Sequence, residues 1–183
     1  MIKTKKDLKR YIKQDRKALK EGQRRPRPFL DHIKRWELFL RKYEYFLNTN
    51  KKVRANIYKF KLYRLGLVLG ISSIPANVFD EGLRIAHFSG ISISEKAKIG
   101  KNCIIFQNVT IGSKSTKTSE SFVKIGDNVV ICANSVIVGN ITIADGVVIG
   151  ANSTVVKDIL IPNSTWAGSP ARLISHNNSD SFY

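Results

Sequence analysis

The chain has 183 residues, of which 43% are hydrophobic and 25% charged, and its formal net charge is +17 at pH 7. This length and composition favour one or two folded domains and exclude a wholly disordered chain. Residues 1–14 are charged throughout, unlike a signal peptide. The most apolar stretch, 65–74, is too short and too rich in Gly and Ser to cross a bilayer. We therefore expect a cytoplasmic protein without a transmembrane segment.

Charge divides the chain into two unequal parts. Residues 1–70 carry 22 Lys and Arg against 6 Asp and Glu, whereas residues 71–183 carry 9 against 8. The two cysteines, Cys103 and Cys132, stand in apolar surroundings outside any CxxC or Cys/His cluster. We expect two small buried side chains in a reducing compartment, and the pattern indicates neither a disulfide framework nor a zinc site.

The first part of the chain has the periodicity of helices. Apolar residues recur at intervals of three or four over three segments, 3–21, 29–47 and 51–69. Gly and Pro residues between positions 22 and 28 separate the first segment from the second. These patterns predict a basic α-helical cap over residues 1–71.

From residue 72 the period changes to six. Large or branched apolar residues mark the repeat at Phe79, Ile85, Ile93, Ile99, Ile105, Ile111, Ile125, Ile131, Ile137, Ile143, Ile149, Val155 and Ile161. Two extra residues near Gly90 and eight within 113–124 interrupt it. Short units that cannot bury their own apolar face must stack on neighbouring units, so the repeat predicts a solenoid.

Asparagine recurs at the fourth position of the six-residue unit, between the large apolar residue and a small one that also points inward. The positions are Asn102, Asn128, Asn134, Asn140 and Asn152. A sharp bend needs a left-handed backbone conformation, which Asn and Gly tolerate better than other residues. The repeat is therefore expected to bend at these asparagines.

This repeat, together with four motifs, resembles the hexapeptide-repeat acyltransferase superfamily, and within it serine acetyltransferase and its polysaccharide O-acetyltransferase relatives. The motifs are GLRIAH at 82–87, IGKNC at 99–103, NVTIG at 108–112 and AGSPAR at 167–172. The resemblance implies a mainly β fold, a left-handed parallel β-helix over residues 72–174 with an N-terminal α-helical region. A loop at 113–124 would protrude from it, and residues 175–183 would form a C-terminal tail. The resemblance also implies a homotrimer or a multiple of it, with active sites between adjacent subunits.

By this resemblance, His87 matches the histidine that removes the proton of the acceptor hydroxyl. An alcohol must lose its proton as it attacks the thioester of acetyl-CoA, and a neutral imidazole can accept that proton. A backbone N–H near Gly112 or Ser113 matches the donor to the oxyanion. Gln107, one coil beyond His87, and its neighbour Asn108 are candidates to orient the imidazole or touch the acceptor, with ordinary strand packing as the alternative.

The family's coenzyme-binding pattern falls on six residues, namely Ala133, Ala151, Lys157, Gly168, Pro170 and Arg172. The alanines would leave room for pantetheine along the coils. The two cations suit the coenzyme phosphates, although surface solubility would also explain them. Relatives often carry another basic residue at the position of Ser175. No metal is expected, because the thioester is already activated and the three histidines are scattered.

Compared with serine acetyltransferase, the chain lacks several charged groups. Ser72 replaces a carboxylate that orients the catalytic histidine, Ala86 replaces an aspartate beside it, and Ser121–Phe122 replaces an Arg-His pair. Each of these groups would have held the ammonium or carboxylate group of a free amino acid or assisted the base, and a buried charge needs its partner. The sequence therefore predicts an acetyl-CoA-dependent O-acetyltransferase acting on a sugar hydroxyl of a capsule, O-antigen or other surface glycan or its precursor. Serine O-acetyltransferase of cysteine biosynthesis and a catalytically inactive hexapeptide scaffold are the alternatives.

The basic helices admit several roles. They could contact an anionic membrane, placing the protein at its inner face, or steer an acidic acceptor. Alternatively, Trp36, Leu40 and Tyr43 could pack against the β-helix or another protomer while the charges face water. Nucleic-acid binding is not indicated, because no reading motif accompanies the charge.

Overall fold

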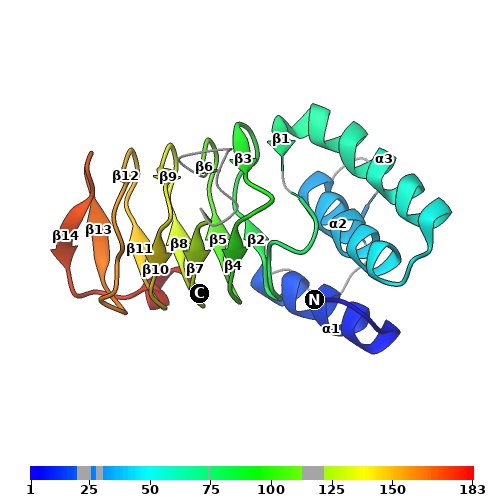
Figure 1. Ribbon diagram of the computed structural model, residues 1–183, viewed down its shortest axis with the longest axis horizontal. Helices are drawn as coiled ribbons and strands as arrows, with labels where there is room; N and C mark the ends of the chain where they lie inside the picture. The colour runs from blue at the N-terminus through cyan, green and yellow to red at the C-terminus, as the bar shows by residue number, and fades with distance from the viewer. Residues whose placement is uncertain (20–25, 28–30, 74, 113–121) are drawn as a thin grey trace.

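The computed structural model describes residues 1–19, 26–27, 31–73, 75–112 and 122–183. Three helices lie at one end of the molecule, and a row of short strands makes up the rest (Figure 1). The helices are α1 (Lys5–Ala18), α2 (His32–Asn48) and α3 (Lys52–Leu69). They coincide with the three helical patterns of the sequence to within about one turn. Within the described ranges, no helix is long and apolar enough to cross a membrane.

The strands form three parallel sheets that run along the row. Sheet A contains β1, β3, β6, β9 and β12; sheet B contains β4, β7 and β10; sheet C contains β2, β5, β8, β11 and β13, with β14 antiparallel to β13 at its end. Their bounds are β1 (Ile71–Ser73), β2 (Arg84–Ile85), β3 (Ile91–Ile93), β4 (Lys98–Ile99), β5 (Ile104–Ile105), β6 (Thr110–Gly112), β7 (Lys124–Ile125), β8 (Val130–Ile131), β9 (Val136–Val138), β10 (Thr142–Ile143), β11 (Val148–Ile149), β12 (Thr154–Val155), β13 (Thr165–Ala167) and β14 (Arg172–Ser175). The chain visits the sheets in the order A, B, C, so each circuit is one coil of a parallel β-helix.

The register of the sheets reproduces the six-residue period of the sequence. Ile93 pairs with Ile111, which is 18 residues later and therefore three repeats on. Ile85 pairs with Ile105 across the two inserted residues, and Ile111 pairs with Ile137 across the eight-residue insertion. The repeating Ile and Val side chains point into one continuous core along the axis, where almost all are buried. Burial of these apolar faces between coils is what drives the stacking.

Asparagine ladders run along the corners between the sheets. Asn102, Asn128, Asn134 and Asn152 adopt the predicted positive φ, and so does Asn108. Amide side chains pass hydrogen bonds from coil to coil, as from Asn102 to Asn128 at 3.0 Å and from Asn134 to Asn152 at 3.0 Å. The prediction for Asn140 is wrong, because at this corner the preceding Gly139 takes the positive φ of 138°. Glycine adopts that conformation at lower cost than asparagine.

Buried charged side chains from the helices cap the open edge of the first coil. Arg41, fully buried, donates to the backbone oxygens of Phe79 and Asp80 at 3.0 and 2.7 Å, and it also binds the carboxylate of Asp15 at 2.8 Å. It reaches Glu44 at 3.0 Å. These backbone oxygens lie at the edge of the β-helix, where no further coil supplies a partner. The guanidinium therefore replaces the missing strand for those groups.

Three carboxylates satisfy the N–H groups of the same edge. Asp15 accepts from the backbone N–H groups of Gly82 and Leu83 at 2.8 and 3.0 Å. Glu44 accepts from the N–H of Asn77 at 2.8 Å, and Glu37 accepts from that of Ile85 at 3.1 Å. Burial raises the pKa of Glu37 well above its ordinary value, and the nearby charge of Asp15 adds to the effect. Burial likewise raises the pKa of Glu44, against the opposing influence of Arg41.

Apolar contacts complete the junction between helices and coils. Trp36 and Leu40 of α2 are buried in the same core cluster as the repeating isoleucines, and Tyr43 packs against that cluster. The structure therefore shows Trp36, Leu40 and Tyr43 packed against the β-helix, which is one of the roles considered for the basic helices. On the outer face of sheet C, a 3₁₀ turn, Ser179–Phe182, places Phe182 beside Phe106 and Cys132.

Replacement of Arg41 by Met should destabilise the whole fold. The variant leaves two buried carboxylates and two edge carbonyls without their donor, and breaking a buried ion pair from one side costs about 3–5 kcal/mol. We expect a loss of this size in the free energy of unfolding, measured by urea titration at fixed protein concentration. Lys13→Met on the exposed side of α1 is the control. Equal stability of the Arg41 and Lys13 variants would contradict the capping role.

Replacement of Glu37 by Gln should stabilise the protein at neutral pH and leave it unchanged in acid. The raised pKa means that the folded state holds a proton which the unfolded chain has released above its ordinary pKa near 4.5. The penalty of Glu37 is therefore absent below that pH and grows by about 1.4 kcal/mol per pH unit above it, up to the folded pKa. The amide oxygen of Gln can still accept from Ile85. Stability curves of both proteins between acid and neutral pH test this, and parallel curves would refute it.

Candidate active site

His87 lies on the corner between sheets C and A, where the two inserted residues interrupt the repeat. Ile85 pairs with Ile105, so His87 is level with Gln107 as the chain leaves the strand. On the far side of the corner, Asn108 donates its backbone N–H to Ser89 at 2.8 Å. The two inserted residues thus widen the corner between β2 and β3. His87 lies in this widened corner and has an exposed side chain. The insertion is what brings this imidazole out of the regular corner.

Gln107 lies on the next coil at the level of His87. Its Oε1 atom is buried and has no hydrogen-bond partner among the described residues. The ring of His87 also lies 5.7 Å from that of Phe106, between centroids. Asn108 differs from Gln107, because its amide donates to Asn134 at 2.9 Å in the corner ladder. The register thus places Gln107 level with the histidine, whereas the amide of Asn108 is engaged in the corner ladder.

The corner continues from Gln107 along a line of small side chains. The backbone oxygen of Gln107 accepts from Asn134 at 3.1 Å, and that of Ala133 accepts from Asn152 at 2.9 Å. Gln107, Ala133 and Ala151 therefore occupy equivalent positions on successive coils. This line of residues, the alanine corner, starts one coil beyond His87 and runs toward the C-terminal end of the β-helix.

A pocket of about 370 Å³ lies at that end of the β-helix. Lys157 and Arg172 line it together with Trp166 and Pro170. Gly168 is next to it and donates its backbone N–H to Ser153 at 3.1 Å. The predicted coenzyme residues thus fall into two groups, the alanine corner and this basic pocket.

A second pocket, of about 320 Å³, flanks His87 on the side of the helices. Ala86 and Phe88, the two neighbours of His87, line it with Arg84 from β2 and several residues at the start of α2. These residues include Asp31, which directly precedes α2, and His32 and Lys34 of its first turn. We call it the His87-side pocket.

The His87-side pocket contains charges of both signs. Asp31 lies 3.3 Å from Arg27 and 3.8 Å from Lys34. His32 has a buried Nδ1 atom without a hydrogen-bond partner in the described part of the chain. Sequence reasoning missed these residues because they come from the helical region, far from the repeat, and no local motif marks them.

Gly112 is not close to His87 within one chain. It is the last residue of β6, whereas His87 lies before the first residue of β3, and these two strands pair in parallel. A strand of three residues is about 10 Å long, so at least this length of sheet A separates Gly112 from His87. A Cβ added at Gly112 would meet no atom of the described residues within 4 Å. Ser113, Ser121 and most of the predicted loop lie outside the described residues.

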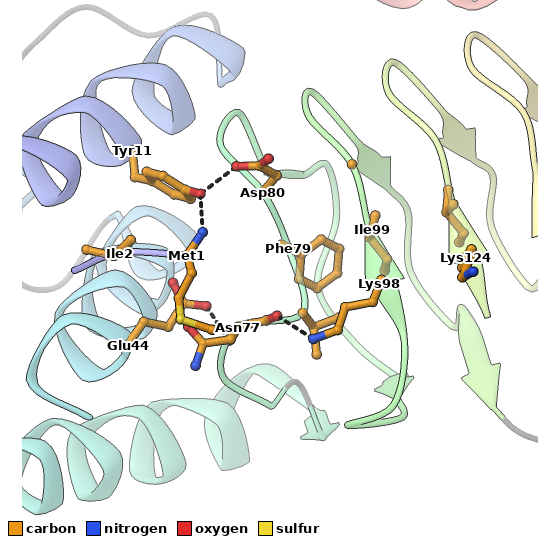
Figure 2. Close-up of a pocket in the computed structure, with 13 residues that line it drawn as sticks. Met1, Ile2, Tyr11, Glu44, Asn77, Phe79, Asp80, Lys98, Ile99 and Lys124 are labelled. Atoms are coloured by element: carbon orange, nitrogen blue, oxygen red, sulfur yellow. Dashed lines mark hydrogen bonds between the residues drawn. The ribbon is translucent and has the colours of Figure 1, made fainter. Parts of the chain in front are cut away.

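A third cavity, of about 390 Å³, is lined by none of the predicted site residues. Figure 2 shows it between the first residues of the chain and the first coils. There the Met1 amino group donates to the hydroxyl of Tyr11 at 3.0 Å, and that hydroxyl donates to Asp80 at 2.5 Å. Lys98 and Lys124 of sheet B line its other side. Within the described ranges, no group of three or more His, Cys, Asp and Glu side chains could hold a metal.

Comparison with known proteins identifies relatives of the coils and of the fold. The family model "Bacterial transferase hexapeptide (six repeats)" matches residues 122–157. Probable serine acetyltransferase 1 of Oryza sativa subsp. japonica is 37% identical over 117 residues, which are 64% of this chain and 38% of that protein. The chain thus spans less than half the length of this curated relative.

Solved structures extend the likeness to the helices. Soybean serine acetyltransferase complexed with serine is 28% identical with a TM-score of 0.73, and the match covers 92% of this chain and 70% of that one. The Neisseria gonorrhoeae serine acetyltransferase in complex with serine is 29% identical with a TM-score of 0.69, covering 93% and 70%. These matches confirm the predicted left-handed parallel β-helix with N-terminal helices.

The same comparisons contradict the predicted sugar acceptor. The three proteins named above are all serine acetyltransferases. The prediction was wrong because it counted only the charges lost at Ser72, Ala86 and Ser121–Phe122. Other charges, carried by the start of α2 and by Arg84, line the pocket beside His87.

Together, the six-residue register, the hexapeptide match and the likeness over more than nine-tenths of the chain lead to one conclusion. The chain belongs to the hexapeptide-repeat acyltransferase superfamily.

Proposed function

We propose that the chain is an acetyl-CoA-dependent serine O-acetyltransferase with His87 as general base. The observation that carries this proposal is the exposed imidazole of His87 beside a pocket with charges of both signs. Free serine presents a carboxylate, an ammonium group and the reacting hydroxyl. A guanidinium can bind the carboxylate in bidentate fashion, and a carboxylate can accept from the ammonium group. In this proposal Arg84 and Asp31 take these roles.

The chemistry requires a base at the hydroxyl. Acetyl-CoA supplies an activated acetyl group, and a ring nitrogen of neutral His87 accepts the hydroxyl proton as the serine oxygen attacks the carbonyl carbon. The proton then passes from the imidazolium to the departing thiolate sulfur. General base catalysis of this kind contributes about 10²- to 10⁴-fold. Gln107 is the positioning residue, since its unpartnered Oε1 can accept from the other ring N–H of His87.

The proposed coenzyme path follows the alanine corner. His87 and Gly168 are the first and last of five stacked positions along this corner. The four steps between them amount to roughly 19 Å. Small side chains at Ala133 and Ala151 leave this path open for an extended pantetheine chain. The pocket at its end has two cations, Lys157 and Arg172, against one carboxylate, Asp158, which accepts from the backbone N–H of Thr142 at 2.7 Å. The excess of positive charge beside apolar side chains fits a phosphate-bearing nucleotide.

The proposed assembly is a homotrimer in which one subunit completes the site of the next. An oxyanion donor must lie within about 3 Å of the developing charge. Within one chain, Gly112 and His87 lie at opposite ends of the sheet A strands. A backbone N–H at Gly112 can therefore serve the reaction only if it comes from a neighbouring copy. The described residues leave space around Gly112, which is compatible with such a contact.

His87→Ala should lower acetyl transfer to free serine by about 10²- to 10⁴-fold while the protein stays folded. The measurement is release of free thiol from acetyl-CoA in the presence of serine. His176→Ala is the matched control, because His176 is an exposed histidine of the tail. If the His87 variant retained wild-type turnover, or if wild-type protein acetylated no serine, the proposed function would be wrong.

Arg84→Met and Arg172→Met should separate the two substrates. Loss of a charge-assisted hydrogen bond costs about 1.5–3 kcal/mol, which corresponds to a 10- to 100-fold rise in KM. We expect Arg84→Met to raise the KM for serine and Arg172→Met to raise the KM for acetyl-CoA, each with little effect on the other substrate. Steady-state kinetics with both substrates varied checks this. Equal changes in both KM values would contradict the assignment of the two pockets.

A further inference from the structure

The outer face of α3 leaves large apolar side chains in water. Val53, Phe60 and Leu67 are 75, 61 and 63% exposed, and Ile57, Tyr63 and Val68 are exposed around them. The opposite face, with Ala55, Leu62, Gly66 and Leu69, is buried. A helix that is apolar on both faces is unusual at a protein surface. The outer face therefore requires a partner.

The exposed residues of α3 form an ordered stripe. At 100° per residue, Val53, Ile57, Phe60 and Leu67 fall within one quadrant opposite the buried face. Lys52 and Lys59 lie along one border of this stripe, and Arg54 and Lys61 lie along the other, by the same rotation. Arg64 projects from within the stripe and places its guanidinium 5.9 Å from the ring centre of Phe60. We call these residues the α3 stripe.

The charges of the α3 stripe decide which partner fits. Between Glu44 and Asp80 the chain carries six basic residues and no acidic one. A second copy packed on this stripe would place two cationic borders against each other, which opposes pairing. An anionic bilayer presents negative charge at the headgroups and an apolar interior beneath them. Cations along both borders and aliphatic or aromatic residues between them are the pattern of helices that lie in that interface.

We propose that α3 binds peripherally to an anionic membrane surface, with Phe60 and Leu67 entering the headgroup region and the bordering lysines and arginines contacting lipid phosphates. Figure 1 shows α3 at the end of the molecule remote from β14, alongside α2. The earlier expectation placed this contact on the basic helices as a group, and burial of Trp36 and Leu40 narrows it to α3. The proposal does not depend on the identity of the acceptor.

Vesicle binding by the full-length protein tests the proposal. We expect cosedimentation with vesicles that contain phosphatidylglycerol, little with pure phosphatidylcholine, and weaker binding at high salt. The double variant Phe60→Ser, Leu67→Ser should reduce the partition coefficient at least tenfold. Lys59→Gln and Lys61→Gln should each reduce it about fivefold. The matched controls are Leu160→Ser with Ile174→Ser, exposed residues of the last coils, and Lys13→Gln on α1.

A spectroscopic measurement distinguishes insertion from attraction by charge alone. Tyr63→Trp adds an indole to the α3 stripe, and its emission should shift to shorter wavelength on anionic vesicles and be quenched by brominated lipid. Absence of vesicle binding by the wild type would overturn the proposal, as would equal binding by the α3 variants and the controls. The proposal would also fail if the Phe60, Leu67 variant changed the oligomeric state in sedimentation equilibrium and left vesicle binding intact, because a second copy would then cover the stripe.

Discussion

The structure depends on how the first coil of the β-helix satisfies its open edge. Every interior coil exchanges backbone hydrogen bonds with a coil on each side, but the first coil has a neighbour on one side alone. Buried backbone N–H and C=O groups left without partners would be costly. Arg41 and three carboxylates, those of Asp15, Glu37 and Glu44, provide these partners. Backbone N–H groups and the guanidinium of Arg41 offset part of the cost of burying these carboxylates, and the raised pKa of Glu37 and of Glu44 reflects the part that remains.

This capping arrangement makes the helices part of the candidate active site. Glu37 accepts from Ile85, two residues before His87, so α2 fixes the strand that leads to the proposed base. The start of the same helix supplies Asp31 and Lys34 to the pocket beside that base. A separate, loosely tethered helical module could not hold a base and a substrate pocket in constant register. Catalytic geometry and edge capping thus have the same structural origin.

Local repetition explains which features the sequence could predict. The six-residue period fixes which side chains point inward and which residues share a corner, so the level of Gln107 with His87 followed from counting alone. The pocket beside His87 depends instead on side chains more than 50 residues earlier in the chain, which no repeat relates to His87. Even within the repeat, Asn140 does not adopt the expected positive φ, because Gly139, one residue earlier, adopts it instead. The contacts of Phe182 with sheet C likewise join positions distant in sequence.

The surface of the helical region is basic because most of its acidic residues are buried or paired. Among those that the structure describes, Asp15, Glu37 and Glu44 are buried at the first coil. Asp7 accepts from the N-terminal end of α1, and Asp31 pairs with basic neighbours. Few acidic groups therefore remain at the surface to neutralise its lysines and arginines, and α3 has none at all. Because these carboxylates are buried, the surface of the helical region is cationic. The α3 stripe lies on the helix that has no acidic residue to neutralise this charge.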